Sequence, residues 1–393
     1  MKKVLMVATI ASTIGQFNMG NIRLLQELGY EVHIACDFID ISIWPEERIK
    51  SFKEELTALN VKCFQICFTR NALNIKKHWS SYKQFKGLLQ QEKYSFIHTH
   101  TPVASAIARI AAKMEGIKVI YTAHGFHFFK GAPFKNWLIF YPIESWLSKY
   151  TDVLITINQE DYKRAKRCFR AKRTVYIPGV GIDTRMFSTG RLTEEDKQDK
   201  REEVGLPRES IVLISVGELN ANKNQELAIK GIAKLKMNYN EIYDKVQYII
   251  CGQGKLKLYL EKLIVSLGVE EHVHLLGYQT RIQEILEVSD VFIFLSKREG
   301  LPVSLMEAMA MGLPSVCSAV RGNIDLIRDK REGYIINHFE VDEVVNAIYK
   351  LIIRPDLRRK MGKQAQKRIE DFSIAQVSQI MRKIYEGINE SRI

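Results

Sequence analysis

The sequence predicts an α/β fold built from two doubly wound parallel sheets, one in each half of the chain. Short apolar runs alternate with helical patterns, the connections between them are short, and one polar segment interrupts this alternation near the middle. Such alternation is typical of parallel sheets that are covered by helices on both faces. At 393 residues the chain is also too long for one hydrophobic core, so two domains of ordinary size are expected.

The first half, residues 1–187, is expected to form a Rossmann-like domain. Its apolar runs predict strands at 3–9, 31–36, 61–66, 96–100, 118–124 and 152–157. Helical patterns lie between them, near 17–28, 45–59, 78–91, 102–115 and 135–149.

A polar, charge-rich segment, 188–209, is expected to connect the two domains. After it the alternation resumes, and residues 210–371 are predicted to form a second Rossmann-like domain. Strands are expected there at 211–217, 246–252, 273–278, 290–296 and 315–320, with helices near 224–236, 255–267 and 280–287 and another from about 303. Apolar residues at helical spacing predict a last helix within 372–393, which we expect to cross back to the first domain.

Composition and charge describe a globular chain with a one-sided basic field. Hydrophobic residues make up 46% and charged residues 26% of the sequence, and the formal net charge is +13. Residues 1–190 contain 27 Lys and Arg against 15 Asp and Glu, whereas the rest of the chain contains 31 against 30. The first half therefore suggests an anionic partner: nucleic acid, the inner face of a membrane, or a phosphate-bearing substrate. An ordinary solvated surface is the alternative.

The chain start and the cysteines indicate a cytoplasmic protein. No apolar run reaches the roughly 18 to 20 residues that a membrane-spanning helix needs. The start MKKVLMVATIAS leads directly into a helical pattern and a second strand, which fits a buried strand better than an export signal. The six cysteines are scattered and suggest reduced thiols in apolar surroundings.

The turn after the strand at 290–296 contains the most informative pattern. Glu299 is expected in a loop, Pro302 at the start of a helix and Glu307 on that helix, while Gly300 permits close approach of the backbone. The start of this helix would expose the N–H groups of Val303, Ser304 and Leu305, which favour a phosphate group. Two carboxylates on either side of a phosphate-binding helix start suit a nucleotide sugar, since carboxylates accept hydrogen bonds from sugar hydroxyls.

The run EGLPVSLMEAMAMGLP, residues 299–314, resembles the E-x7-E signature of retaining glycosyltransferase family four, which has the GT-B fold. Further similarity lies in the segments 122–131, 177–187, 215–224, 251–257 and 276–286. The resemblance implies two Rossmann-like domains that face a central cleft, with the acceptor bound by the first and the nucleotide sugar by the second. It is closest in kind to bacterial enzymes of capsule, exopolysaccharide and O-antigen synthesis.

The resemblance also implies roles for individual residues. Glu307 would hold the donor ribose, Glu299 the transferred hexose, and the backbone of Gly300, Leu301 and Val303 the sugar and the diphosphate. The other donor-binding positions that we expect are Pro302, Ser304, Gly217, Gly252, Gly254, Gly277, Tyr278, Arg321 and Gly15. Gly15 is assigned to a glycine loop after the first strand, although the paired glycines of the family are absent there.

Two further side chains complete the predicted catalytic set. Lys223 would face the donor diphosphate and stabilise the departing nucleotide, a task that a divalent metal performs elsewhere. Many relatives place an arginine where this chain has Glu218, and we expect Arg321 or Arg298 to supply that cation. By resemblance, His124 faces the transferred sugar from the first domain.

No metal is expected. His98, His100 and His127 could be combined with His124 into a ligand set, but a structural role for those three is favoured, and no D-x-D motif ends a strand. The glycines of CGQGK, 251–255, lack the third glycine of a dinucleotide fingerprint, which disfavours a dehydrogenase.

Aromatic and basic residues are mixed in the segment 125–150. Such a mixture suits a membrane interface, and a buried helix is the equally weighted alternative. The basic run KRAKRCFRAKR, 163–173, is a second candidate membrane contact.

Together these observations predict a retaining, metal-independent glycosyltransferase. We expect it to use a nucleotide-diphosphate sugar, of UDP type, and to extend a lipid-linked or saccharide acceptor at the inner membrane face, with no nucleic acid as partner. An epimerase of UDP-sugars, a GT-B phosphorylase and a non-catalytic basic module for membranes or nucleic acid are the alternatives. The sugar, the nucleotide, the acceptor, the linkage and the oligomeric state are left open.

Overall fold

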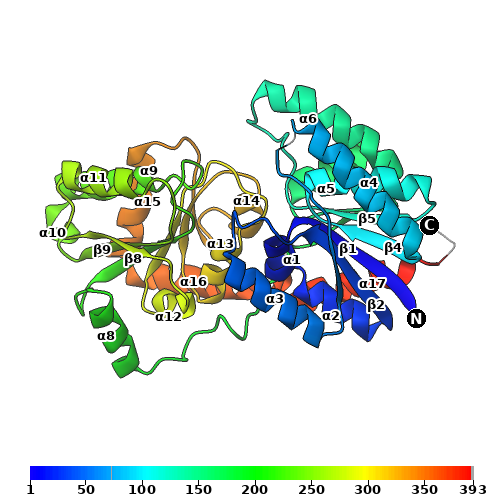
Figure 1. The fold of residues 1–393 in the computed structure, drawn as a ribbon. Coiled ribbons are helices and arrows are strands. Elements are labelled where there is room, and N and C mark those ends of the chain that lie inside the picture. The colour runs from blue at the N-terminus through cyan, green and yellow to red at the C-terminus, as the bar shows by residue number, and fades with distance from the viewer. Residues whose placement is uncertain (72, 391–393) are drawn as a thin grey trace. The chain divides into compact units, whose positions relative to one another are not determined.

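The computed structural model describes residues 1–71 and 73–390, and the chain forms two compact units. The first unit contains 1–180 and 375–393, and the second contains 181–374 (Figure 1). The boundary therefore lies seven residues before the expected one at 187. The reason is a short parallel bridge, in which Ile182 N–H donates to Phe372 O at 3.0 Å and Ile374 N–H donates to Ile182 O at 3.0 Å. This bridge joins the segment after Val180 to the end of the second unit.

The first unit contains, within its described residues, one seven-stranded parallel sheet with the order β3-β2-β1-β4-β5-β6-β7. Its strands are β1 Lys2–Ile10, β2 Tyr30–Asp37, β3 Lys62–Gln65, β4 Tyr94–Thr99, β5 Lys118–Ala123, β6 Val153–Thr156 and β7 Arg173–Tyr176. The first six match the expected runs, and the doubly wound prediction is confirmed. Strand β7 was not predicted, because only four residues of modest hydrophobicity form it.

The helices of the first unit alternate with these strands. They are α1 Ala11–Phe17, α2 Met19–Glu27, α3 Glu46–Ala58, α4 Ile75–Gln91, α5 Pro102–Met114, α6 Phe134–Leu147, α7 Gln159–Cys168 and α17 Ile374–Gly387, with a 3-10 turn at Ser148–Tyr150. The helix expected near 17–28 is α2, and α1, which begins directly after β1, was not predicted. The basic run 163–173 covers the second half of α7, the connection 169–172 and the first residue of β7.

The last helix packs on the first unit, as expected. Tyr385 of α17 is fully buried, its hydroxyl lies 2.9 Å from His98 Nδ1 and its ring stacks on Phe96 at 5.9 Å between centroids. Lys118 Nζ donates to the carbonyl oxygen of Ile388 at 2.7 Å. Because these contacts join the chain end to β4 and β5, the crossing back to the first unit is confirmed.

The second unit contains, among its described residues, a six-stranded parallel sheet with the order β10-β9-β8-β11-β12-β13. Its strands are β8 Ile211–Val216, β9 Val246–Cys251, β10 Val273–Gly277, β11 Val291–Phe294, β12 Ser315–Ser318 and β13 Gly333–Ile336. The first five were expected. Strand β13 was not predicted.

Helices cover the second sheet (Figure 1). They are α8 Glu194–Glu203, α9 Gln225–Asn238, α10 Asn240–Tyr243, α11 Lys257–Leu267, α12 Ile282–Glu287, α13 Val303–Ala310, α14 Asn323–Leu326, α15 Val341–Ile353 and α16 Pro355–Ile369, with a 3-10 turn at Glu370–Phe372. Residues of α9, α11 and α15 share one apolar core with β8, β9 and β11. The expected connecting segment holds α8, whose Thr193 and Asp196 form a capping box.

The order of the strands indicates where each sheet would bind a ligand. In each sheet the chain turns outward in both directions from a central pair, β1 and β4 in the first unit and β8 and β11 in the second. In open α/β sheets, ligands bind beyond the carboxyl ends of the strands at this reversal. The loops after β8 and β11 contain Lys223 and Glu299, and those after β1 and β4 lead into α1 and α5.

No helix in the ranges 1–71 and 73–390 is both long enough and apolar enough to cross a bilayer.

Candidate donor site

The two loops at the strand reversal of the second unit are tied together. Lys297 N–H donates to Asn222 O at 2.8 Å, and Asn222 Nδ2 donates to Arg298 O at 3.0 Å. Asn224 Nδ2 donates to the carbonyl oxygen of Leu295 at 3.2 Å, and Asn224 itself has a positive φ of 56°. The sequence interpretation overlooked these asparagines, although an Asn-rich turn such as NANKN after a buried strand signals a turn that side-chain amides hold in place.

The predicted cation and the predicted loop carboxylate meet within this pair of loops. Lys223 Nζ lies 2.7 Å from Glu299 Oε1, and their side chains are 21% and 11% exposed. The ammonium also lies 4.7 Å from the ring centroid of Phe294, a cation–π contact at the end of β11. The two charges therefore hold each other in a defined position at the strand ends, with part of each open to solvent.

Glycines bring the backbones of the neighbouring loops close together. A Cβ on Gly252, whose φ is +150°, would lie 2.0 Å from Gly217 O, and one on Gly254 would lie 2.4 Å from Leu219 O. Gly252 N–H donates to Gly277 O at 2.7 Å and Gly217 N–H donates to Cys251 O at 2.9 Å. The glycines at the ends of β8, β9 and β10 thus bring these three backbone segments into contact.

These backbone segments line a hollow of about 390 Å³ in the second unit. Its walls come from the ends of β8, β9 and β10 and from the start of α12. The lining residues are Val216, Gly217, Glu218, Cys251, Gly252, Gln253, Tyr278, Gln279 and Ile282. Tyr278 is 70% exposed, so its ring is available to a planar ligand. Gln279 and Ile282 had not been predicted as lining residues.

The helix start after Pro302 has the predicted form, with one adjustment. Pro302 is the N-cap residue of α13 and Val303 is the first helical residue, and no side chain caps this end. The first helical hydrogen bond runs from Met306 N–H to Pro302 O at 3.2 Å. The N–H groups of Val303, Ser304 and Leu305 precede it and lack a helical acceptor, which makes this end of α13 suitable for an anion.

Glu307 lies one turn further along α13. Burial raises the pKa of its carboxyl group to about 7, and no charged neighbour contributes to that shift. Among the described residues, no hydrogen-bond donor to the Glu307 carboxylate is found. A half-buried carboxylate without a donor is stabilised when ligand hydroxyls donate hydrogen bonds to it.

The candidate replacement cations differ in their positions. Arg321 is 5% exposed and its Nε donates to the backbone oxygen of Glu299 at 3.0 Å, so it supports the loop of that carboxylate. A Cβ on the next residue, Gly322, would lie 2.4 Å from Gly300 O, which is why the β12–α14 turn can pack against this loop. Arg298 is exposed. Glu218 is exposed as well.

In the first unit, His124 lies at the end of β5 with two other histidines near it. His124 Nε2 is 3.4 Å from His100 Nδ1, and the rings of His100 and His98 are 4.1 Å apart. Burial lowers the pKa of His124 to about 4, and the pKa values of His98 and His100 fall below their ordinary value for the same reason. His124 is therefore a neutral imidazole near pH 7.

In the parts of the chain that the structure describes, no group of three or more His, Cys, Asp or Glu side chains is arranged so that it could hold a metal ion. The nitrogens of His98 are engaged by Tyr385 OH at 2.9 Å and by Thr122 Oγ1 at 2.8 Å.

The expectation of a glycine loop at Gly15 is wrong. Gly15 lies inside α1, and a Cβ there would meet the Trp44 ring at 2.3 Å. A side chain at this position would displace the Trp44 ring, which comes from before α3 and packs directly on the helix backbone.

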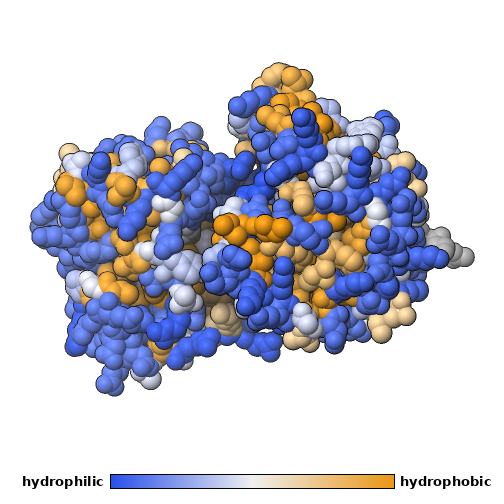
Figure 2. All heavy atoms as spheres, viewed as in Figure 1, coloured by the Kyte–Doolittle hydropathy of each residue, from blue (hydrophilic) through white to orange (hydrophobic). Residues whose placement is uncertain are grey.

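The helix in the segment 125–150 is not a buried helix, because only Glu144 and Leu147 of α6 are buried. Phe126 and Phe128 are buried, whereas α6 exposes apolar side chains along its length. The exposed ones are Phe134, Leu138, Ile139, Ile143 and Trp146, and Figure 2 shows apolar surface over this part of the first unit.

The chain thus has two doubly wound units, and the second carries a lysine–glutamate pair and an uncapped helix start at its strand reversal. This is the architecture of the GT-B class of glycosyltransferases. Comparison with known proteins agrees. The model described as glycosyl transferases group 1 matches residues 196–368, and the model described as Glycosyltransferase Family 4 matches residues 21–185.

Two relatives are similar to this chain over most of its length. The chain is 34% identical to the putative glycosyltransferase EpsD of Bacillus subtilis strain 168, over 98% of this chain and 97% of that protein. It is 30% identical to an Escherichia coli enzyme, UDP-Gal:alpha-D-GlcNAc-diphosphoundecaprenol alpha-1,3-galactosyltransferase, over 87% of this chain and 85% of that enzyme. The chain therefore belongs to glycosyltransferase family 4.

Solved structures show the same fold. The Anabaena protein Alr3699/HepE, in complex with UDP and glucose, matches with a TM-score of 0.77 and 17% identity over 98% of this chain and 100% of that one. A glycosyltransferase from Rickettsia africae matches with a TM-score of 0.78 and 17% identity over 99% of each chain.

Proposed function

We propose that this glycosyltransferase moves a hexose-type sugar from a UDP-sugar to an acceptor carried on a polyprenyl diphosphate, in the synthesis of a surface polysaccharide. The observation that carries the donor half is the unpaired Glu307 carboxylate on α13, a helix whose uncapped start follows the Lys223–Glu299 pair. The name of the Escherichia coli relative, which specifies UDP-Gal and a diphosphoundecaprenol, supports both halves.

The residues divide the work of donor binding between them. The N–H groups at the start of α13 bind the diphosphate, and Glu307 accepts hydrogen bonds from the ribose hydroxyls. Glu299, held by Lys223 and by the support of Arg321 on its backbone, accepts hydrogen bonds from the hexose. The base lies in the hollow beside Tyr278, and Gly217, Gly252, Gly254 and Gly277 let the nucleotide approach the backbone.

Catalysis follows from charge placement. As the bond to the sugar breaks, negative charge grows on the leaving diphosphate, and the ammonium of Lys223 with the helix start stabilises it without a metal. The acceptor hydroxyl attacks from the face that the diphosphate leaves and passes its proton to a donor phosphate oxygen, so the configuration is retained. His124, neutral near pH 7, hydrogen-bonds a sugar hydroxyl rather than supplying positive charge.

The donor assignment is tested by thermal unfolding against a panel of UDP-, GDP-, dTDP- and ADP-sugars. A ligand present at about 100 times its Kd stabilises the protein by roughly 2.7 kcal/mol. We expect a UDP-sugar to raise the Tm of the wild type and to raise that of Glu307→Ala much less. Equal shifts in the two proteins would disprove the donor site, and an epimerised nucleotide sugar or a free sugar phosphate as product would disprove transfer. The anomeric configuration of the product, read by NMR, checks retention.

We also propose that the protein contacts the inner membrane face through α6. Phe134 and Leu138 of this helix are 79% and 67% exposed, and Lys135 beside them is exposed as well. Apolar side chains next to cations suit the headgroup boundary of an anionic bilayer. Sedimentation with vesicles rich in phosphatidylglycerol is expected to fall at least several-fold in Leu138→Asp. The exposed Val265 of α11 provides the control Val265→Asp, and equal sedimentation of both variants would contradict this contact.

A further inference from the structure

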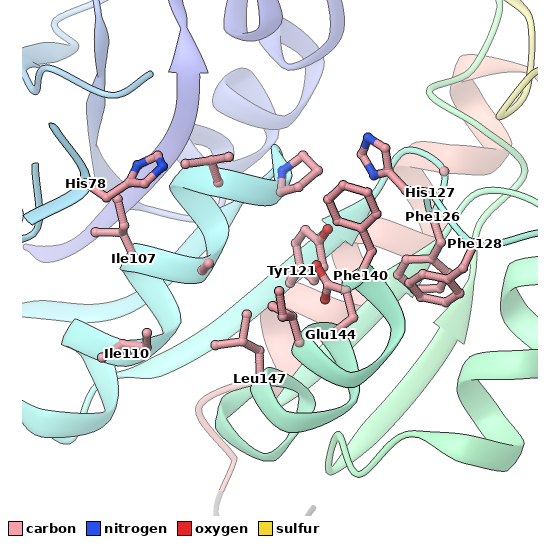
Figure 3. Close-up of a pocket in the computed structure, with 15 residues that line it drawn as sticks. His78, Ile107, Ile110, Tyr121, Phe126, His127, Phe128, Phe140, Glu144 and Leu147 are labelled. Carbon is pink, nitrogen blue, oxygen red and sulfur yellow. The ribbon is translucent and has the colours of Figure 1, made fainter. Parts of the chain in front are cut away.

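An apolar pocket of about 270 Å³ opens in the first unit between α5 and α6 (Figure 3). Figure 3 shows Ile107 and Ile110 of α5 on one side and Phe140 and Leu147 of α6 on the other. Tyr121 of β5 and the aromatic pair Phe126 and Phe128 close the inner end. The volume is below the roughly 300 to 1,000 Å³ of pockets that enclose a drug-sized ligand, so the pocket suits one segment of an apolar chain.

The wall of this pocket presents no uncompensated charge. Glu144 is the one charged side chain among the described lining residues, and it forms a bidentate pair with Arg109 at 3.0 and 3.2 Å. The side chains are 11% and 1% exposed, and the guanidinium lies 4.3 Å over the Tyr121 ring. Because the acid is neutralised from behind, a hydrocarbon can enter without burying an unpaired ion.

A polar hollow of about 480 Å³ adjoins the apolar pocket. The two share Pro102, Val103, His127 and Phe140, and the rings of His127 and Phe140 stack at 4.7 Å where the hollows meet. The polar hollow lies beyond the carboxyl ends of β1 and β4, at the strand reversal of the first sheet. Besides the shared residues, polar side chains of Thr9, Ser12, Thr13, Gln16, Arg70 and Thr101 line it, together with the apolar Ile10 and Ile43.

The apolar pocket also continues onto the exposed face of α6. Ile143 lines the pocket and is 48% exposed, and Ile139 and Trp146 beside it are 52% and 45% exposed. The segments 71–91 and 131–150 contain six lysines, whereas Glu144, already paired, is their one acidic residue. The opening of the pocket is therefore apolar and set among cations, which is complementary to an anionic membrane surface.

We propose that these two hollows bind one amphipathic ligand, the lipid end of the acceptor. This proposal rests on the proposed function and specifies how the acceptor is bound. The first isoprene units of a polyprenyl chain lie between α5 and α6. The diphosphate lies in the polar hollow, where Arg70 and the Thr13 hydroxyl donate to it. The hydroxyls of Thr9 and Thr101 lie beside it and are hydrogen-bonded to each other at 2.6 Å. The chain then leaves over Ile143 toward the bilayer, and the attached sugar extends away from α5.

The test uses full-length protein and farnesyl diphosphate, a short polyprenyl diphosphate, with binding measured by titration calorimetry. The wild type is expected to bind farnesyl diphosphate at least tenfold more tightly than inorganic diphosphate and than farnesol. Ala106→Phe fills the pocket from α5 and is expected to weaken farnesyl diphosphate at least tenfold while leaving inorganic diphosphate unchanged. Arg70→Ala is expected to weaken both diphosphates to the same degree.

Two variants control for added bulk and for a change at the site itself. Ala58→Phe adds the same side chain to an exposed position of α3, and Ala106→Ser keeps the pocket open, so both are expected to bind as the wild type does. Unchanged binding of farnesyl diphosphate by a folded Ala106→Phe would overturn the proposal, as would equal affinity of the wild type for farnesol. Thermal stabilisation of Ala106→Phe by UDP-sugars separates the two proposals. If this stabilisation persists, the donor-site proposal is supported independently of the result with farnesyl diphosphate.

Discussion

Glu307→Gln is expected to make the protein more stable at pH 8 and, at the same time, to weaken its binding of UDP about 100-fold. The pKa of the carboxyl group is about 7 in the folded protein against an ordinary value of 4.5. Below pH 4.5 both states are protonated, and between pH 4.5 and 7 only the unfolded state loses its proton. Stability therefore falls as pH rises through this window, by roughly 3 kcal/mol at most, and glutamine removes this loss.

The loss of UDP affinity has a separate origin. Hydrogen bonds to a charged group contribute roughly 1.5 to 3 kcal/mol each, and Glu307 accepts from two ribose hydroxyls in the proposed complex. Calorimetric titration with UDP and thermal unfolding at pH 5 and pH 8 measure the two effects on one protein.

Glu343→Gln is the matched control, since this glutamate is in the same unit but its pKa is lowered. Desolvation alone would raise the pKa of Glu343. Its carboxylate accepts hydrogen bonds from the backbone N–H groups of Asn337 and His338 at 2.9 and 3.0 Å, and these bonds outweigh desolvation, so that the pKa is lowered. Its stabilisation is present above the unfolded pKa and is lost as pH falls, so glutamine here should reduce stability at pH 8 and leave UDP binding intact. Tight UDP binding by Glu307→Gln would show that the ribose is held elsewhere.

Lys223→Met is expected to lower kcat by about 100- to 1,000-fold with a smaller change in KM. The magnitude is that of removing one preorganised group that stabilises developing charge in an active site. The ammonium, 2.7 Å from Glu299 Oε1, stands where the leaving diphosphate gains charge in the proposed complex, so the loss falls mainly on the transition state. Steady-state kinetics with the UDP-sugar from the panel gives both constants.

Three comparisons decide whether charge is the cause. Lys223→Arg should recover part of kcat, because it restores the cation. Lys230→Met removes a surface lysine that is paired with Glu226 on α9 and should have no effect. EDTA should leave the wild type active. A Lys223→Met enzyme with near-normal kcat, or a wild type that EDTA inactivates, would contradict a lysine in the role of a metal.

The strands and most helices could be predicted because the pattern of each element is local. Buried parallel strands such as β1 and β8 are continuous apolar runs, and the helices between them show their own periodicity. Strands β7 and β13 were not predicted, since each has four residues, of which none is buried in β7 and only two are buried in β13. The sequence placed the boundary at 187 because the polar segment that contains α8 begins there. In the structure the second unit begins at Gly181, because Ile182 is hydrogen-bonded to Phe372 and Ile374 at the end of that unit.

The candidate donor site could be predicted from the sequence only where its residues lie in one turn. Glu299, Pro302 and Glu307 are close in sequence, and their spacing alone places a carboxylate one turn beyond a helix start. Gly15 was misassigned, because a glycine after a strand suggests a loop while the nearness of Trp44 is invisible in the chain order. The burial of His98 and His100, which lowers their pKa values, also could not be read from the sequence, because it depends on the packing of β4 against β5 and α17.

The sequence by itself determined the fold class, the family and the helix start that carries Glu307, since each depends on residues that are near neighbours along the chain. Only the tertiary structure decided that Lys223 pairs with Glu299, that burial raises the pKa of Glu307, and that an apolar pocket opens between α5 and α6 beside a polar one. These features depend on segments that are distant in sequence. Burial, charge pairing and cavity shape arise from packing and have no local signature.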